Sequence, residues 1–205
     1  KQVTGGINAT GTITLSGNAP VGGITVALSS NSANATVPAN VTIAEGSSSA
    51  TFGIVTTPVA TDTAISISAS AQGVTVNNTL TVLAPRPASL AVKPTVVVGG
   101  SAAKATVTFT GAIPAGGLPM TVQIGKDTQT INVAQASTTA TFNVPTPSVP
   151  ETSPLQVSAT LSGSTATATI SLVPSGGFSL GFNPTAVTGG NKATGTITLV
   201  GKAPV

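Results

Sequence analysis

The sequence predicts an all-β protein made of β-sandwiches that repeat about every 90 residues. Short signatures return at a nearly fixed spacing, most segments alternate apolar and polar residues, and glycine-rich turn signals separate these segments. Self-similarity at a fixed period is typical of arrays of structural units. Alternation with a period of two is typical of strands that bury one face, and no segment keeps a helical period.

Three signatures mark the repeat, beginning at residues 3, 97 and 187 (VTGG in the first copy), at residues 12, 106 and 196 (TITL), and at residues 19, 113 and 203 (APV). We therefore expect a first unit over residues 1–84 that lacks its first strand. A complete second unit should follow over residues 88–173, and residues 178–205 should form the first two strands of a third unit. Units of this length can form their own cores.

In the first unit, alternating apolar side chains should point into the core: Ile13 and Leu15; Ile24, Val26 and Leu28; Val41 and Ile43; Phe52 and Ile54; Ile65, Ile67 and Ala69; Leu80 and Val82. Val, Ile and Thr suit a pleated, half-buried surface. Compared with the second unit, the first has about four extra residues within 31–40. We interpret them as a surface loop, because loops tolerate changes of length.

Residues 82–89 join the first unit to the second, and residues 173–177 form the corresponding link to the third. Both links are short and contain proline. Short links stiffened by proline restrict bending between the segments they join. We therefore expect the units to form a rod.

The second unit opens with a strand at residues 89–93, followed by Pro94 and a Val-Gly-Gly turn at which the chain should switch sheets. Thr106, Thr108 and Thr110 should face outward. The inward set is Ala105, Val107 and Phe109; Leu118, Met120 and Val122; Ile131 and Val133; Ala140, Phe142 and Val144; Leu155, Val157, Ala159 and Leu161; Ala166, Ala168, Ile170 and Leu172. An opening strand followed by six or seven more predicts an Ig-like sandwich, without the Cys-Trp-Cys core of antibody domains.

The aligned positions of the two units carry matching side chains. We therefore expect one shared backbone fold, with Ile13 and Val107, Phe52 and Phe142, and Ile67 and Val157 at equivalent buried positions.

Several strings between Val3 and Phe52, among them VTGG, TGTITLSG, APVGG, VALSS, ATVPANVTI and SATF, resemble the tandem bacterial Ig-like repeats of large secreted and cell-surface proteins. The resemblance continues to Val82, recurs more loosely over residues 88–172 and restarts at Phe178. It implies the Ig-like fold and an extracellular setting in a stalk, adhesin or filament. Such repeats share no catalytic residues, so the resemblance carries no site over to this chain.

Composition excludes several classes of function. The chain has no histidine and no cysteine, so it has no imidazole base, no thiol nucleophile and no His/Cys zinc site. Its seven basic residues are scattered, which argues against nucleic-acid binding. Apolar runs are only a few residues long, so no segment predicts a membrane span. We expect no enzyme, no cofactor and no metal site.

The remaining candidates are weak. We assign the four acids, Glu45, Asp62, Asp127 and Glu151, to turns rather than to catalysis or calcium binding. Asp62 and Asp127 should bond their own backbone. The glycine pairs at residues 5–6, 99–100 and 189–190 should form tight turns with positive φ rather than phosphate cradles, because no helix follows them.

Aromatic, lysine, threonine and asparagine residues supply the other candidate sites. Phe52, Phe109 and Phe142 fall on inward positions, and we expect Phe178 and Phe182 to pack as well. Lys104 has the outward phase, which argues against an internal Lys–Asn isopeptide bond. The threonine rows, Thr106/Thr108/Thr110, Thr165/Thr167/Thr169 and Thr79/Thr81, are interpreted as a hydroxyl-covered surface, although rows about 7 Å apart also suit ice or a crystalline polysaccharide. Glycosylation sequons occur at Asn8, Asn34, Asn40 and Asn77.

We interpret the chain as a structural protein, part of an extracellular filament or cell-surface stalk. The alternative is an adhesin or a carbohydrate-binding module appended to a larger secreted protein. Expected partners are other copies or neighbouring repeats of the same protein, with a cell-surface or polysaccharide target as the second option.

The chain begins just after the place of an opening strand and stops inside a turn of the third copy. One explanation is donor-strand exchange, in which residues 178–184 supply the strand that another molecule lacks. The other is a window on a longer continuous polymer. We expect the window, because a donated tail would also bring residues 194–199, a strand that the first unit already has.

Overall fold

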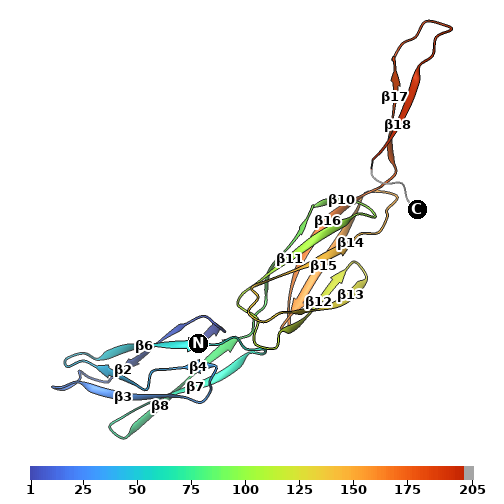
Figure 1. Cartoon of the computed structure of the whole chain (residues 1–205). Coiled ribbons are helices and arrows are strands. Elements are labelled where there is room, and N and C mark those ends of the chain that lie inside the picture. The colour runs from blue at the N-terminus through green and yellow to red at the C-terminus, as the bar shows by residue number, and fades with distance from the viewer. Residues whose placement is uncertain (201–205) are drawn as a thin grey trace.

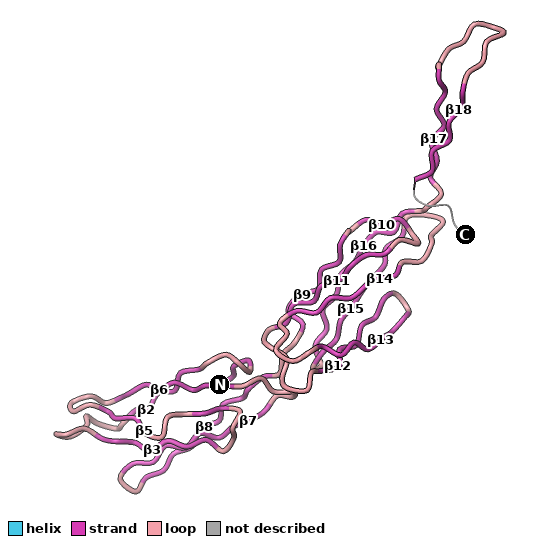
Figure 2. The backbone as a smooth tube through the Cα atoms, in the orientation of Figure 1, coloured by secondary structure: helices cyan, strands magenta, loops and turns pink. Residues whose placement is uncertain are grey.

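The computed structural model describes residues 1–200, so the third APV signature at residues 203–205 lies outside the described residues. The described part contains strands β1–β18 and no helix. Figures 1 and 2 show an elongated arrangement of two β-sandwiches followed by a separate hairpin. We call these parts the first sandwich (β1–β8), the second sandwich (β9–β16) and the C-terminal hairpin (β17 and β18).

The strands of the first sandwich are β1 (Gln2–Thr4), β2 (Ala9–Thr14), β3 (Ile24–Ser30), β4 (Ala35–Thr36), β5 (Asn40–Ile43), β6 (Ser49–Thr56), β7 (Thr63–Ala71) and β8 (Val74–Leu83). Those of the second are β9 (Pro87–Lys93), β10 (Val96–Val98), β11 (Ala102–Phe109), β12 (Leu118–Ile124), β13 (Asp127–Val133), β14 (Thr139–Pro145), β15 (Ser153–Leu161) and β16 (Ser164–Val173). The hairpin consists of β17 (Gly177–Asn183) and β18 (Thr194–Val200).

The second sandwich has the Ig-like topology that the sequence predicts. One sheet has the order β10-β16-β15-β12-β13, and the facing sheet has the order β14-β11-β9. The opening strand β9 pairs antiparallel with β11, whereas β10, a few residues later, pairs parallel with β16 in the other sheet. The expected switch between sheets after Pro94 is therefore confirmed.

The predicted strand register of the second sandwich is also confirmed. Val107 and Val157 are fully buried, Thr108 and Thr110 are exposed, and Thr106 is half-buried. All the other predicted inward residues are buried or half-buried, and all of them except Ala166 belong to one continuous core between the two sheets. A strand pleat places alternate side chains on opposite faces, so agreement at one position fixes the whole strand.

The first sandwich repeats the five-stranded sheet of the second, in the order β1-β8-β7-β3-β5, but its facing sheet differs. That sheet has the order β2-β6-β4, so β2 has no neighbour in the place that β9 occupies beside β11. Ile13 and Phe52 hold the positions equivalent to Val107 and Phe142, as predicted. However, both are only half-buried, because no strand covers that side of the core.

The extra residues of the first sandwich are not simply a surface loop, which corrects the prediction. Ala35 and Thr36 form the short strand β4, which pairs with Thr56 and Val55 at the edge of β6. Ala35 is fully buried and packs into the core. The insertion therefore satisfies edge hydrogen bonds of β6 that would otherwise face solvent.

A buried threonine fixes the turn after β1. The hydroxyl of Thr56 donates a hydrogen bond to the Ile7 carbonyl (2.8 Å) and accepts one from the Gly6 N–H (3.0 Å). At the equivalent place in the second sandwich, buried Thr146 donates a hydrogen bond to the Ser101 carbonyl. Pattern analysis missed both residues, because threonine suits either face of a strand.

The glycine pairs divide into two roles. Gly6, Gly100 and Gly190 have φ of 87°, 86° and 93°, which confirms the expected tight turns. Gly5 is required for a different reason, since a Cβ there would lie 2.7 Å from the Thr57 carbonyl oxygen. Gly99 stands equally close to the carbonyl of Pro147.

The C-terminal hairpin contradicts the expectation that Phe178 and Phe182 would pack. They are 69% and 56% exposed, and Leu180, between them on the same face, is 55% exposed. The described residues contain only two strands of this unit, so no facing sheet covers the apolar side of β17.

We expect Phe142→Ala to destabilise the second sandwich by about 3–5 kcal/mol, because it opens a cavity in a light core. Phe52→Ala should cost roughly half as much, since Phe52 is half-buried. Denaturant unfolding of the whole chain, with hydrogen exchange at the amides of β11 and β14, would measure the first value. The exposed neighbour Thr141→Ala is the control and should change stability by less than about 0.5 kcal/mol. Equal effects of the alanine substitutions at residues 141 and 142 would contradict the assigned core.

Candidate functional site

The acidic side chains do not converge on a catalytic or metal site. Glu45 accepts a hydrogen bond from the Gly22 N–H (3.2 Å), Asp127 begins β13 after a two-residue turn, and Glu151 is exposed in a bend before β15. Over residues 1–200, no three His, Cys, Asp or Glu residues form a group that could hold a metal ion.

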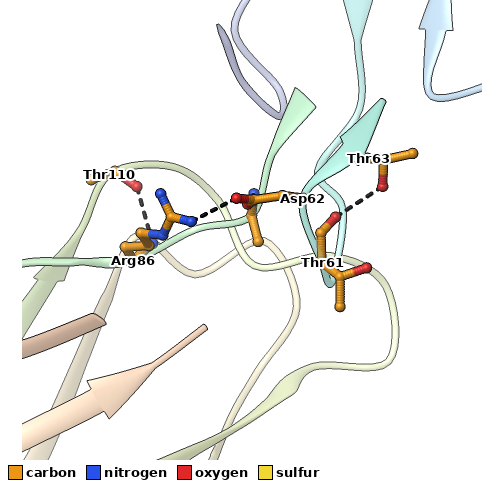
Figure 3. Close-up of polar contacts among 6 residues, drawn as sticks. Thr61, Asp62, Thr63, Arg86 and Thr110 are labelled. Carbon is orange, nitrogen blue, oxygen red and sulfur yellow. Dashed lines mark hydrogen bonds and ion pairs between the residues drawn. The ribbon is translucent and has the colours of Figure 1, made fainter. Parts of the chain in front are cut away.

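Asp62 differs from the prediction for it. We expected it to bond its own local backbone, but its carboxylate reaches the link between the two sandwiches. Its Oδ1 accepts a hydrogen bond from the Ala84 N–H (2.9 Å), and its Oδ2 pairs with Arg86 Nη2 at 2.6 Å (Figure 3). The local hydrogen bond at this turn is made by its neighbour instead, from Thr63 Oγ1 to the Thr61 carbonyl (2.9 Å).

Arg86 also binds the second sandwich. Its backbone N–H donates to Thr110 Oγ1 at 3.0 Å (Figure 3). In return, the Thr110 N–H donates to the Arg86 carbonyl (2.9 Å). One residue of the link is thus bonded through its side chain to the first sandwich and through its backbone to the second. We call Asp62, Arg86 and Thr110, with the link residues 84–87, the joint.

The rest of the joint is closely packed. Ala84, Pro85 and Pro87 are buried, so the link is part of the packed structure. Gly111 of the second sandwich lies against the turn after β1, because a Cβ there would stand 2.7 Å from Thr4 Cγ2 and 3.3 Å from the Gly5 carbonyl oxygen. A larger residue at position 111 would push the two sandwiches apart.

The ion pair itself contributes little energy. The side chains of Arg86 and Asp62 are 37% and 39% exposed, so water screens their attraction. Pairs of this kind stabilise proteins by about 0–1 kcal/mol. Its effect is mainly geometric, because the same carboxylate holds both the guanidinium and the backbone of the link.

The link to the C-terminal hairpin lacks these groups. Gly176 occupies the position equivalent to Arg86, and Thr152 the position equivalent to Asp62. Both are exposed. No carboxylate–guanidinium pair can therefore form between these two positions.

A second feature lies beside β2, at the edge of the first sandwich that no described strand covers. An apolar groove of about 290 Å³ runs beside β2 and is lined by residues that include Gly11, Phe52, Ile54, Ile67 and Leu80. The Phe52 ring lies over Gly11, where a Cβ would stand 2.2 Å from its Cζ. This groove occupies the position that β9 fills in the second sandwich.

The remaining sequence candidates lie on the surface. Thr165, Thr167 and Thr169 form an exposed row on β16, and Lys104 is exposed as its phase predicted. Hydroxyls of neighbouring strands bond each other, as in the pair Thr160–Thr165 (2.8 Å), so the threonine rows present a hydroxyl-covered face. Among the sequon asparagines, Asn8, Asn40 and Asn77 are exposed, whereas Asn34 is half-buried and accepts a hydrogen bond from Thr57 Oγ1.

Sequence reasoning missed the joint because its groups are 24 residues apart and share no local pattern. One signal was available, since Arg86 is the only arginine of the chain and stands in the link. The groove could be anticipated only in part, from the missing first strand of the first unit.

Comparison with known proteins shows no family. No protein-family model matches the sequence, and no curated protein matches it. Similar solved structures include a tandem of titin domains (14% identity, TM-score 0.37, 85% of this chain and 63% of that chain). Another is the adhesin InvE of Yersinia pseudotuberculosis (20% identity, TM-score 0.38, 83% of this chain and 55% of that chain). A third is invasin, a bacterial integrin-binding protein (14% identity, TM-score 0.44, 95% of this chain and 46% of that chain).

This chain spans 46% to 63% of the length of these three structures. Over the part of the chain that the structure describes, no helix has the length and hydrophobicity to cross a membrane.

We expect Asp62 and Arg86 to show a coupling energy of about 0.2–1 kcal/mol in a double-mutant cycle of Asp62→Asn and Arg86→Gln. Denaturant unfolding at low salt would measure it, and the coupling should fall as salt screens the pair. Glu45→Gln combined with Arg86→Gln is the matched control and should show no coupling, because Glu45 bonds Gly22 instead. A coupling of zero at low salt would contradict an ion pair at the joint.

Proposed function

We propose that this chain is a structural, non-catalytic protein, a segment of an extracellular filament or cell-surface stalk. Its units are residues 1–84, residues 88–173 and the unit that begins at residue 178. They act as stiff spacers in the manner of tandem bacterial Ig-like repeats. The polypeptide associates with further copies or repeats of the same protein.

The joint carries this proposal. Arg86 is bonded to both sandwiches, and the prolines on either side of it are buried. Joints that bury the link restrict the relative motion of neighbouring domains, whereas exposed links leave them free to move. A protein that acts by holding two points apart needs restriction of this kind.

Composition and surface support the same function. Only 5% of the residues are charged, so the outward faces consist largely of hydroxyls. Low net charge favours association, because like-charged surfaces repel each other over a Debye length. Without histidine and cysteine, and with its acids dispersed, the chain offers few groups for chemistry.

The second candidate function is an adhesin or a carbohydrate-binding module. The exposed row Thr165, Thr167 and Thr169 on β16 favours it, because regularly spaced hydroxyls suit a repeating polysaccharide surface. A glycan array separates the two functions. Glycan binding that is lost when these threonines are changed to valine would support the binding module over the spacer.

We expect small-angle scattering of the native chain to report an extended particle of uniform shape. Replacing Pro85 and Arg86 with glycine should shorten the average particle and broaden its distribution, because the link loses its stiffness and its contacts. The control is Lys126→Gly, an exposed turn substitution outside the joint. A native scattering profile as broad as that of the glycine variant would contradict the spacer function.

A further inference from the structure

Two lysines of the second sandwich stand directly opposite each other. Lys93 of β9 pairs with Lys104 of β11 in the antiparallel ladder, although the strand β10 separates them in the sequence. Both lysines are exposed, and they lie on the outer face of the three-stranded sheet, because their neighbours Val92 and Ala105 are buried. The fold thus brings two scattered basic residues together as one pair.

This pairing opposes the stability of the sheet, because like charges directly opposite each other on neighbouring strands repel. The ion pair recorded over residues 1–200 is that of Asp62 and Arg86, so neither lysine has a carboxylate within 4.0 Å. The two acids of the second sandwich lie elsewhere, Asp127 on β13 of the other sheet and Glu151 in the bend before β15. An anion bound between the two ammonium groups would remove the repulsion.

The other units carry neutral residues at the same places of the repeat. At the positions equivalent to Lys93 and Lys104, the C-terminal hairpin has Asn183 and Thr194, which also pair with each other. The first sandwich has Thr10 in the place of Lys104. Neutral side chains therefore suit these strands, so the fold itself does not require the lysine pair.

A surface rich in hydroxyls continues from the lysine pair along the same side of the sheet. Asn143 of β14 pairs with Lys104 and extends the polar row to the third strand. The next rows are Ala91, Thr106 and Thr141, then Ser89, Thr108 and Thr139. We call these residues, with Lys93, Lys104 and Asn143, the lysine face. All are exposed except Thr106, which is half-buried, and none of them is acidic.

We propose that the lysine face binds an acidic polysaccharide. Its anionic groups, carboxylate or sulfate, lie between the ammonium groups of Lys93 and Lys104, which donate hydrogen bonds and accept none. The amide of Asn143 and the threonine hydroxyls bond the hydroxyls of the sugar rings. The inference goes beyond the spacer function, does not depend on it, and concerns a different sheet from the threonine row of β16.

Other anionic partners fit the lysine face less well. An anionic membrane attracts larger clusters of basic residues than this pair. Single-stranded nucleic acids stack their bases on exposed aromatic rings, whereas Phe109 and Phe142, the phenylalanines of the second sandwich, are buried. Protein partners bury apolar and aromatic side chains at the centre of an interface, and for these the lysine face offers only Ala91. A polysaccharide needs charge and hydroxyl groups, which the lysine face supplies together.

Titration with soluble polymers tests the proposal on the full 205-residue chain. Polygalacturonate carries carboxylates, dextran sulfate carries sulfates, and neutral dextran is the control polymer. In calorimetry at low salt, the chain should bind at least one acidic polymer but not dextran, and added salt should weaken binding by screening the charges. The acidic polymer that binds more tightly identifies the anionic group. Binding to neither, or equal binding to dextran, would overturn the proposal.

The residues of the C-terminal hairpin supply the substitutions that remove the lysine pair. Lys93→Asn with Lys104→Thr should weaken polymer binding about tenfold or more, because charge-assisted hydrogen bonds are lost. Lys126→Gln with Lys192→Gln is the matched control, since it lowers the net charge equally but lies in the turns after β12 and β17. Equal losses in the two double variants would mean general attraction to a basic protein and would overturn the assigned site.

Unfolding measurements separate lost binding from lost folding. Lys93→Asn with Lys104→Thr should leave the denaturant midpoint of the second sandwich unchanged or raise it, because the repulsion is gone. Saturating polymer should raise the midpoint of the native chain but not that of this variant, since a ligand stabilises only the state that binds it. A variant less stable than the native chain would contradict the repulsion from which the site is inferred. None of these results bears on the stiff joint, which scattering measures without polymer.

Discussion

A β-strand with one apolar face is stable in water only when that face is covered and its edge is paired or protected, and this requirement governs the whole chain. In the second sandwich, β9 meets it on one side of the core by pairing with β11. In the first sandwich, Phe52 leans over Gly11, at the edge of β2 beside which the described residues place no strand. At the opposite edge of that sheet, β4 pairs with β6.

The same requirement explains why equivalent residues differ in burial. Val107 is fully buried whereas Ile13, its counterpart, is half-buried, although both stand on the inward face of the same strand of the fold. The glycine at position 11 replaces the alanine at 105, and that small change lets the phenylalanine of β6 cross to the open side. Burial therefore depends on the neighbouring strand as much as on the residue itself.

Alternation predicted the register of the second sandwich, because a period of two leaves only one choice of inward face. Together with the repeats and turn signals it predicted the fold class, and Pro94 with the Val-Gly-Gly turn predicted the switch between sheets. Alternation could not predict β4, since two residues show no period. The bonds of Asp62 and Arg86 are set by how two separate units meet, and sequence pattern within a unit carries no information about that contact. Likewise, pattern identified the apolar face of β17 but could not say what covers it.

The two links of this chain differ in the groups that can tie them to the sandwich before them: Asp62 and Arg86 at one, and Thr152 and Gly176 at the equivalent positions of the other. In any array that contains both kinds of link, bending concentrates at the glycine link. The persistence length of such an array is then set by how often each link occurs. Substitutions at the link positions can therefore change the curvature of such an array without any change in the cores of its units.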